Sequence, residues 1–321
     1  MSRTKAPDLP PLEAGTIVAP GYQVLAHLCR TGWLDLYDAW SEERDCRCVV
    51  KVLRPDRRHD RRLRERLLQE GRWLQAFTHP HLVRAYETVE SPEPFVVLET
   101  LTGETLAHVI ERRRHRLAAD DLAQLGLHLC SAVHYLHGQG LLHLDLKPSN
   151  VVIDCRRAKV LDLSIARPPG PGRAGVGTFC YLAPEQARGG ALTPAADVWG
   201  IGTTLYEAAT GDVPFDPGET VEGGYDSDGP YDAYGSYDAD GVDGVDGVDG
   251  EDDADADFWY PQLEAAAPPV ATRRRLPHGL AAAIDACLRP DPDARPTVRA
   301  LTAALDAQLP QQQRAVREPA A

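Results

Sequence analysis

The chain has 321 residues, 43% of them hydrophobic, and a formal net charge of −14. This length corresponds to about two domains with cores of their own, and no apolar run reaches the roughly 18 residues that a membrane-spanning helix requires. The N-terminal residues are charged and lack an apolar stretch, which argues against a secretory signal. Seven cysteines without disulfide-framework spacing indicate free thiols in a reducing compartment. We therefore expect a cytoplasmic protein without a membrane span.

The first half of the chain is predicted to be rich in strands. β-branched and aromatic residues form short runs bounded by turn residues, and an arginine-rich stretch among them carries leucines near helical spacing. The expected strands are residues 22–28, 33–40, 46–54, 81–90 and 94–100, and the expected helix is Arg61–Phe77.

The second half is predicted to be mainly helical. Leucines and a valine between Leu122 and Leu136 form one helical stripe, with Asp120 as the expected N-cap and Gly138 near the end. Residues 151–164 (VVIDCRRAKVLDLS) indicate a β-hairpin with Arg156 and Arg157 at its turn. Residues 198–210 are apolar almost all round, which favours a buried helix, and a last helix carries Val298, Leu301 and Leu305. Strands followed by helices predict an α+β fold in two lobes.

The negative charge is concentrated in residues 216–257, which contain 16 Asp or Glu and no Lys or Arg. The rest of the chain consequently carries a formal charge of +2. The segment favours a solvated, disordered insert because little of its Gly, Asp and Tyr content can be buried. Its aspartates recur every third residue and do not match the EF-hand calcium pattern. We expect its deletion to leave folding intact.

Residues 143–150 (HLDLKPSN) place an acid, a lysine and an amide within six residues. Phosphoryl transfer from ATP requires an oriented hydroxyl, neutralised phosphate charge and a fixed magnesium ion. Asp145 could accept the hydroxyl proton, and Lys147 could reach the γ-phosphate. Asn150 and Asp162 could hold the metal. The alternative is that the two aspartates are ordinary turn acids.

Lys51, on a predicted strand, could hold the α- and β-phosphates if a carboxylate kept it in place. Glu70 lies at a suitable position on the predicted helix, although an arginine-rich helix would also carry exposed glutamates. A strand lysine alone is a weak signal, because such residues usually lie on the surface.

From about Tyr22 to Leu309 the chain resembles the eukaryotic-like (Hanks-type) bacterial serine/threonine protein kinase family. The resemblance is carried by six motifs in the family's order and spacing. They are VVKVLR with Lys51, HLDLKPSN with Asp145, VLDLSIA with Asp162, GTFCYLAPEQARGG with Glu185, the apolar DVWGIGTTLYEAATGDVPF, and CLRPDPDARPT with Arg295.

This resemblance implies a bilobal protein kinase fold, with a β-rich N-lobe and a mainly helical C-lobe. The expected boundaries are an N-terminal tail at 1–20, the N-lobe at 21–101, the C-lobe at 102–309 with the acidic insert, and a C-terminal tail at 310–321. It implies transfer of the γ-phosphoryl group of ATP, with Mg²⁺ or Mn²⁺, to Ser/Thr hydroxyls of proteins. We expect no nucleic-acid partner, and the sequence leaves the oligomeric state open.

The resemblance also assigns site residues. Thr178 matches the family threonine that bonds to the catalytic aspartate and lysine, and Leu98 matches the gatekeeper before the hinge at 99–101. Glu185 is expected to pair with Arg295. The implied catalytic set is Lys51, Glu70, Asp145, Lys147 and Thr178, and the implied nucleotide-binding set is Leu28, Gly32, Val49, Lys51, Leu98, Glu99, Leu101, Asn150 and Asp162, of which Asn150 and Asp162 hold the metal.

The chain departs from the family pattern at the glycine-rich loop, whose glycines map onto Cys29, Thr31 and Leu34 and of which only the neighbouring Gly32 remains. Glycines there let the backbone approach the phosphates. We therefore expect weak ATP binding, and tighter binding when glycine is restored at Thr31 and Leu34. The alternative function is a pseudokinase scaffold. A small-molecule kinase of the aminoglycoside or choline type would lack the Ala-Pro-Glu motif and the pair of Glu185 with its arginine.

Further departures concern the segment after Asp162. Leu163 and Ser164 replace the family's Phe and Gly, and Leu144 replaces the arginine that helps to bind an activating phosphate. Residues 165–177 (IARPPGPGRAGVG) contain no Ser, Thr or Tyr. The arginine that would bind the phosphate and the hydroxyl that would receive it are both missing. We therefore expect that this segment is not a phosphorylation switch.

Overall fold

The computed structural model describes residues 9–112, 116–215 and 260–310. The chain divides into two compact units, the first comprising Met1–Gly103 with Lys159–Ser164, and the second the remainder. The acidic segment 216–257 lies outside the described residues, as do most of the expected C-terminal tail and the first eight residues.

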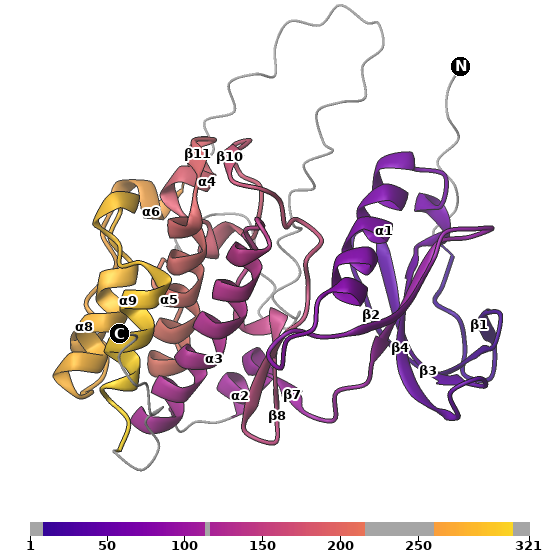
Figure 1. The fold of residues 1–321 in the computed structure, drawn as a ribbon, viewed down its shortest axis with the longest axis horizontal. Coiled ribbons are helices and arrows are strands. Elements are labelled where there is room, and N and C mark those ends of the chain that lie inside the picture. The colour runs from indigo at the N-terminus through magenta and orange to yellow at the C-terminus, as the bar shows by residue number, and fades with distance from the viewer. Residues whose placement is uncertain (1–8, 113–115, 216–259, 311–321) are drawn as a thin grey trace, which may run out of the picture. The chain divides into compact units, whose positions relative to one another are not determined.

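The first unit is built on a six-stranded antiparallel sheet in the order β1-β2-β3-β4-β6-β5, with helix α1 alongside it (Figure 1). Buried side chains of β2, β3, β4 and β6 share one core cluster that includes Tyr22, Val50 and Phe95. The elements are β1 (Ile17–Ala19), β2 (Tyr22–Arg30), β3 (Leu34–Ser41), β4 (Cys46–Leu53), α1 (Arg61–Ala76), β5 (Ala85–Val89) and β6 (Phe95–Glu99).

Helix α1 begins after Asp60, whose carboxylate accepts the N–H groups of Arg62 and Leu63. This N-cap is typically worth about 1 kcal/mol of helix stability. A Cβ at Gly71 would lie 2.6 Å from atoms of Thr88 and Val96, so only glycine allows the helix to approach β5 and β6 this closely. The close approach fixes the position of the preceding residue, a glutamate, above the sheet.

The expected strand at 81–90 begins four residues later than predicted, at Ala85. The Val83 N–H donates to the Val160 carbonyl, and the Val160 N–H donates to the His81 carbonyl, both at 2.9 Å. The backbone of residues 81–83 is therefore hydrogen-bonded to Val160, almost 80 positions away. The pairing with β6 starts only after these residues.

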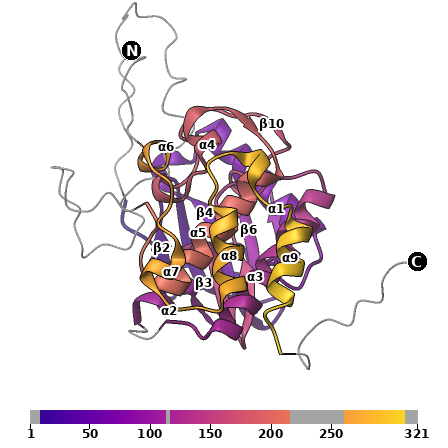
Figure 2. The same ribbon diagram turned by 90° about the vertical axis from the view of Figure 1, so that its left-hand side faces the viewer.

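The second unit is mainly helical, and α3, α5, α8 and α9 run side by side (Figures 1 and 2). Helix α5 is buried along nearly its whole length, as predicted from its apolar sequence. The helices are α2 (Leu106–Arg112), α3 (Ala119–Gly138), α4 (Pro184–Arg188), α5 (Pro194–Thr210), α6 (Pro261–Glu264), α7 (Val270–Arg273), α8 (His278–Cys287) and α9 (Val298–Asp306). The short strands are β7 (Glu104–Thr105), β8 (Val151–Asp154), β10 (Gly170–Pro171) and β11 (Ala191–Leu192), together with β9 (Arg157–Val160), whose last two residues belong to the first unit. The sheet-rich first part and helical second part confirm the α+β prediction.

Two local predictions in the second unit were wrong in detail. The N-cap of α3 is Ala118, and Asp120 lies inside the first turn, where an acidic side chain is favoured by the positive end of the helix dipole. The hairpin turn consists of Cys155 and Arg156, with φ of 48° and 65°, while Arg157 already begins β9. Two-residue hairpin turns favour this left-handed backbone because it matches the twist of the strands.

Candidate active site

Lys51 on β4 is held by two carboxylates within the first unit. Its Nζ lies 2.8 Å from Glu70 Oε1 on α1 and 3.7 Å from Asp162 Oδ2, and its side chain is only 5% exposed. Burial opposes the positive charge, but the nearby carboxylates of Asp162 and Glu70 outweigh it and raise the pKa of Lys51. The expected Lys51–Glu70 ion pair is present, and the lysine stays charged.

Asp162 follows β9 in a segment shaped by the residues that replace the family's Phe and Gly. Leu163 is buried, and its N–H donates to Glu70 Oε1 at 3.3 Å. The Ser164 N–H donates to Asp162 Oδ1 at 2.6 Å. Burial works against the charge of Asp162, yet Lys51 and the hydrogen bonds from Ser164 lower its pKa. The carboxylate is therefore ionised, which is the form that binds a cation.

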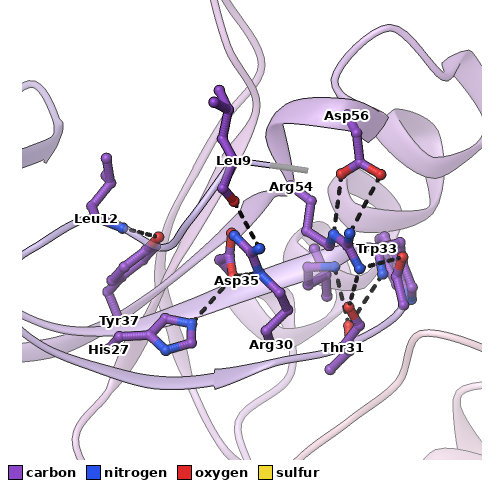
Figure 3. A network of polar contacts seen from close by, with 12 residues as sticks. Leu9, Leu12, His27, Arg30, Thr31, Trp33, Asp35, Tyr37, Arg54 and Asp56 are labelled. Carbon is purple, nitrogen blue, oxygen red and sulfur yellow. Dashed lines mark hydrogen bonds and ion pairs between the residues drawn. The ribbon is translucent and has the colours of Figure 1, made fainter. Parts of the chain in front are cut away.

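The turn between β2 and β3 uses its own backbone donors (Figure 3). The Thr31 N–H donates to the Leu34 carbonyl at 2.9 Å, and Thr31 Oγ1 accepts the N–H groups of Trp33 and Leu34 at 3.4 and 3.0 Å. Arg54, held by Asp56, donates to the carbonyl of Thr31 at 3.2 Å. Of the backbone N–H groups of residues 31–34, three thus form hydrogen bonds inside the turn. In a glycine-rich loop these groups would be available to bind phosphates.

The structure corrects our expectation for Leu34. Its side chain is 3% exposed and forms part of the core of the first unit, so it does not stand where phosphates would meet the backbone. Replacing it with glycine would open a cavity and cost about 2–5 kcal/mol of stability. Of the two expected obstructions, only Thr31 remains.

The remaining nucleotide-binding candidates of the first unit, besides Gly32 in this turn, lie on β2, β4 and β6 or just after β6. Leu28 on β2 is 52% exposed, and Val49 on β4 pairs with the buried Leu98 on β6. Glu99 donates its N–H to the Arg84 carbonyl and binds Lys159 through its carboxylate. Leu101, the last of these candidates, follows β6 and is partly buried.

In the second unit, Asp197 anchors the segment that carries the candidate catalytic residues. Its carboxylate, 1% exposed, accepts the N–H groups of His143 and Leu144 at 2.8–3.1 Å and pairs with His137 Nε2 at 2.8 Å. Leu144 itself adopts φ of 68°. A non-glycine residue in this region is strained, and the bonds to Asp197 stabilise it there. His143 is fully buried, and its Nδ1 accepts the Asp145 N–H at 3.2 Å.

Asp145 lies at the centre of a hydrogen-bonded group of side chains. The Thr178 hydroxyl donates to Asp145 Oδ1 at 2.7 Å, and Lys147 Nζ lies 2.7 Å from Thr178 Oγ1 and 3.3 Å from Asp145 Oδ2. Asn150 Nδ2 donates to the carbonyl and to Oδ2 of Asp145, both at 2.9 Å. The structure therefore brings together all four predicted residues of this unit.

Asn150 in the second unit and Asp162 in the first unit each present an oxygen atom of the kind that binds a small divalent cation. Both hydrogen bonds of the Asn150 side chain use Nδ2, so its Oδ1 remains as a ligand atom. The Asp162 side chain is 30% exposed and ionised. Mg²⁺ typically takes one or two protein oxygens and completes its shell with phosphates and water. Within the described ranges no three His, Cys, Asp or Glu residues form a metal cluster of their own.

Residues 165–177 are fastened to the body of the second unit. Arg167 pairs with Leu142 across an isolated antiparallel bridge. The side chain of the buried Gln186 donates through Nε2 to the backbone carbonyls of Leu144 and Val176 at 2.9 and 3.2 Å. The backbone carbonyl of Gln186 accepts the Gly175 N–H at 3.0 Å. No charged partner is needed for these contacts.

The predicted pair of Glu185 and Arg295 is present as two parallel bonds of 2.7 and 2.9 Å. The sequence reasoning missed Gln186 and Asp197 as supporting residues. A signal existed for Asp197, because it is an acid at the start of a mainly apolar helix.

Residues 32–305 match the family model described as protein kinase domain. The chain belongs to the protein kinase domain family. It is similar to the serine/threonine-protein kinase PknB of Mycobacterium leprae, with 34% identity over 179 residues that cover 52% of this chain and 29% of that protein. Probable serine/threonine-protein kinase PknB of Lactococcus lactis is 30% identical over 213 residues, covering 64% and 34%. This kinase domain thus spans about a third of the length of these relatives.

Among solved structures, the crystal structure of the Mycobacterium tuberculosis PknI kinase domain superimposes with a TM-score of 0.63. The match covers 93% of this chain and 99% of that chain at 20% identity, which shows the common fold. No helix in the described part of the chain combines the length and the hydropathy needed to span a membrane.

Proposed function

We propose that this kinase domain transfers the γ-phosphoryl group of ATP to serine and threonine hydroxyls of proteins. The observation that carries the proposal is the Asp145–Thr178–Lys147 group, in which a carboxylate, a hydroxyl and an ammonium lie within 3.3 Å of one another. The names of the PknB relatives support serine and threonine as the accepting residues.

The proposed roles follow from the contacts of each side chain. Asp145 orients the substrate hydroxyl and accepts its proton as the oxygen attacks the γ-phosphorus and ADP leaves. Lys147 stabilises the charge of the transferring group, and Lys51, fixed by Glu70, binds the α- and β-phosphates. Asn150 and Asp162 would hold Mg²⁺ or Mn²⁺, which neutralises phosphate charge when bound. Leu28, Gly32, Val49, Leu98, Glu99 and Leu101 complete the proposed nucleotide site.

We also propose the lobe boundaries, the cellular location and the partners of the domain. We assign the N-lobe to residues 21–101 and the C-lobe to 102–309, with tails on either side. The seven cysteines are free thiols, which supports a reducing, cytoplasmic location. ATP and proteins are the proposed partners, without nucleic acid.

The test is ATP turnover and phosphate incorporation into the chain and a generic protein substrate. We expect Asp145→Asn to lower turnover by about 10²–10⁴-fold, as is typical for loss of a catalytic base. Glu111→Gln makes the same carboxylate-to-amide change at an exposed position of the same unit and should have no effect. Equal turnover in wild type and Asp145→Asn would contradict catalysis by this site and favour a scaffold.

A further inference from the structure

Arg66 on α1 contacts two segments of the first unit that are far apart in sequence. Its guanidinium lies over the Trp33 ring, 4.8 Å from the ring centroid. Its Nε donates to the Ser164 carbonyl at 2.8 Å, and its Nη2 lies 3.4 Å from Ser164 Oγ. One side chain thus joins the turn between β2 and β3 to the segment that follows Asp162.

The contacts of Arg66 continue into the candidate metal-binding and lysine-binding groups. The Ser164 N–H donates to Asp162 Oδ1 at 2.6 Å, and the neighbouring Leu163 N–H donates to Glu70 Oε1 at 3.3 Å. Glu70 lies one helical turn after Arg66 and holds Lys51. The bond to the Ser164 carbonyl therefore restrains the backbone directly after the two amides that orient Asp162 and Glu70.

The geometry requires an arginine. A planar guanidinium can stack on an indole with its face and donate hydrogen bonds from its edge at the same time, whereas a lysine ammonium offers no such plane. Trp33 is 4% exposed, so the ring is held in place for stacking. Both segments that Arg66 joins depart from the family pattern, the first by its loss of glycines in the β2–β3 turn and the second by the serine after Leu163.

We propose that Arg66 is a positioning residue that clasps the β2–β3 turn to the 162–164 segment. Through this clasp, order in the turn and the orientation of the Asp162 carboxylate are coupled. The inference deepens the proposed function, because it concerns how the metal-binding carboxylate of that site is held. No phosphate takes part in it.

The first measurement is amide hydrogen exchange in the nucleotide-free chain, compared between wild type, Arg66→Gln, Arg66→Lys and Arg61→Gln. The last variant makes the same change at the exposed first residue of α1 and serves as the matched control. We expect faster exchange at the Leu163 and Ser164 amides in Arg66→Gln, a smaller increase in Arg66→Lys, and none in Arg61→Gln. Trp33→Phe, which keeps an aromatic face, should stay closer to wild type than Trp33→Leu.

The second measurement is the binding of Mn²⁺ in the presence of a non-hydrolysable ATP analogue, followed by electron paramagnetic resonance. Loss of a residue that orients a metal ligand commonly weakens metal binding by about 10–100-fold, and we expect this for Arg66→Gln. Asp162→Asn sets the value for loss of the ligand itself.

Each outcome decides the proposal. If the Leu163 and Ser164 amides exchange in Arg66→Gln at the same rate as in Arg61→Gln, the clasp is overturned. If they exchange faster in Arg66→Gln but the Mn²⁺ affinity is unchanged, the role of Arg66 in positioning Asp162 is overturned. Should wild type bind no Mn²⁺–nucleotide, the proposed function would fail, and the exchange comparison alone would decide whether Arg66 clasps the two segments.

Discussion

Two buried carboxylates on α5 differ in the number of donors that reach them. Asp197 accepts two backbone N–H groups and pairs with a histidine. Glu207 accepts a 2.6 Å bond from the Tyr181 hydroxyl, and burial raises the pKa of Glu207 to about 7. One neutral donor offsets only part of the cost of burying a charge. Glu207 is therefore a buried acid whose protonation responds to pH near neutrality.

This shift predicts a pH dependence of stability. Between about pH 4.5, the ordinary pKa, and about pH 7, the folded chain binds more protons at Glu207 than the unfolded chain does. The free energy of unfolding should therefore fall as pH rises through this window, by up to about 3 kcal/mol. Glu207→Gln stays neutral, keeps an acceptor for Tyr181, and should remove this slope.

The measurement is urea unfolding from pH 4.5 to pH 8, with Glu207→Gln subtracted from wild type so that the histidines cancel. Glu111→Gln, on the exposed side of α2, is the control. Parallel stability curves for wild type and Glu207→Gln would contradict the prediction.

At the scale of elements, we expect the β2–β3 turn to limit the strength of nucleotide binding. Thr31→Gly removes the hydroxyl that accepts the Trp33 and Leu34 N–H groups and frees these amides for phosphate oxygens. A hydrogen bond to a charged group is worth about 1.5–3 kcal/mol, which exceeds the roughly 1 kcal/mol that glycine costs in backbone freedom. We expect Thr31→Gly to bind a non-hydrolysable Mg-ATP analogue several-fold more tightly.

Isothermal titration calorimetry checks this expectation. Thr31→Val removes the hydroxyl but keeps a branched side chain. It therefore measures the effect of releasing the two N–H groups without the added backbone flexibility of glycine. Affinity that is unchanged or weaker in Thr31→Gly would show that the turn is not the limiting feature.

The segment 165–177 is an element ordered by backbone bonds and by Gln186. We expect phosphatase treatment to leave turnover nearly unchanged, because the segment has no hydroxyl to phosphorylate and Leu144 offers no charge. Gln186→Leu should lower turnover at least tenfold, since it leaves the carbonyls of Leu144 and Val176 without this donor, at about 1–3 kcal/mol each.

Mass spectrometry should place any autophosphorylation outside residues 165–177. A wild-type chain that loses its activity after phosphatase treatment would refute the idea of a segment ordered without modification.

At the scale of the whole molecule, Arg295 connects distant parts of the second unit. It forms two bonds to Glu185, 110 residues earlier, donates to three backbone carbonyls and lies 4.9 Å from the centroid of the Trp199 ring. Arg295→Met leaves Glu185 as an uncompensated buried charge. We expect a loss of about 3–5 kcal/mol in the free energy of unfolding.

Chemical denaturation of the second unit, followed by tryptophan fluorescence, measures this loss. Replacing both partners, as Glu185→Leu with Arg295→Met, should recover part of it, because no lone charge is then buried. A double variant as unstable as Arg295→Met would show that the packing of the arginine, and not its charge, stabilises the unit.

The sequence by itself determined the features that depend on near neighbours. The span of α1 follows from its leucine spacing, and Asp145, Lys147 and Asn150 come together from a motif of eight residues. Apolar periodicity, turn residues and motif spacing act over one or two turns of chain, so they can be read without knowing the fold. The position of Glu70 on the predicted helix indicated it as the partner of Lys51, and the family resemblance implies the same pair.

Only the tertiary structure decided the contacts between distant segments. The start of β5 depends on Val160, the burial of Leu34 on the core of the first unit, and the role of Arg66 on a serine 98 positions away. Gln186 likewise follows a recognised motif, but its bond to Leu144 crosses 42 positions. A sequence pattern records which side chains can form such bonds, whereas the partner that each one meets is set by how the strands and helices pack.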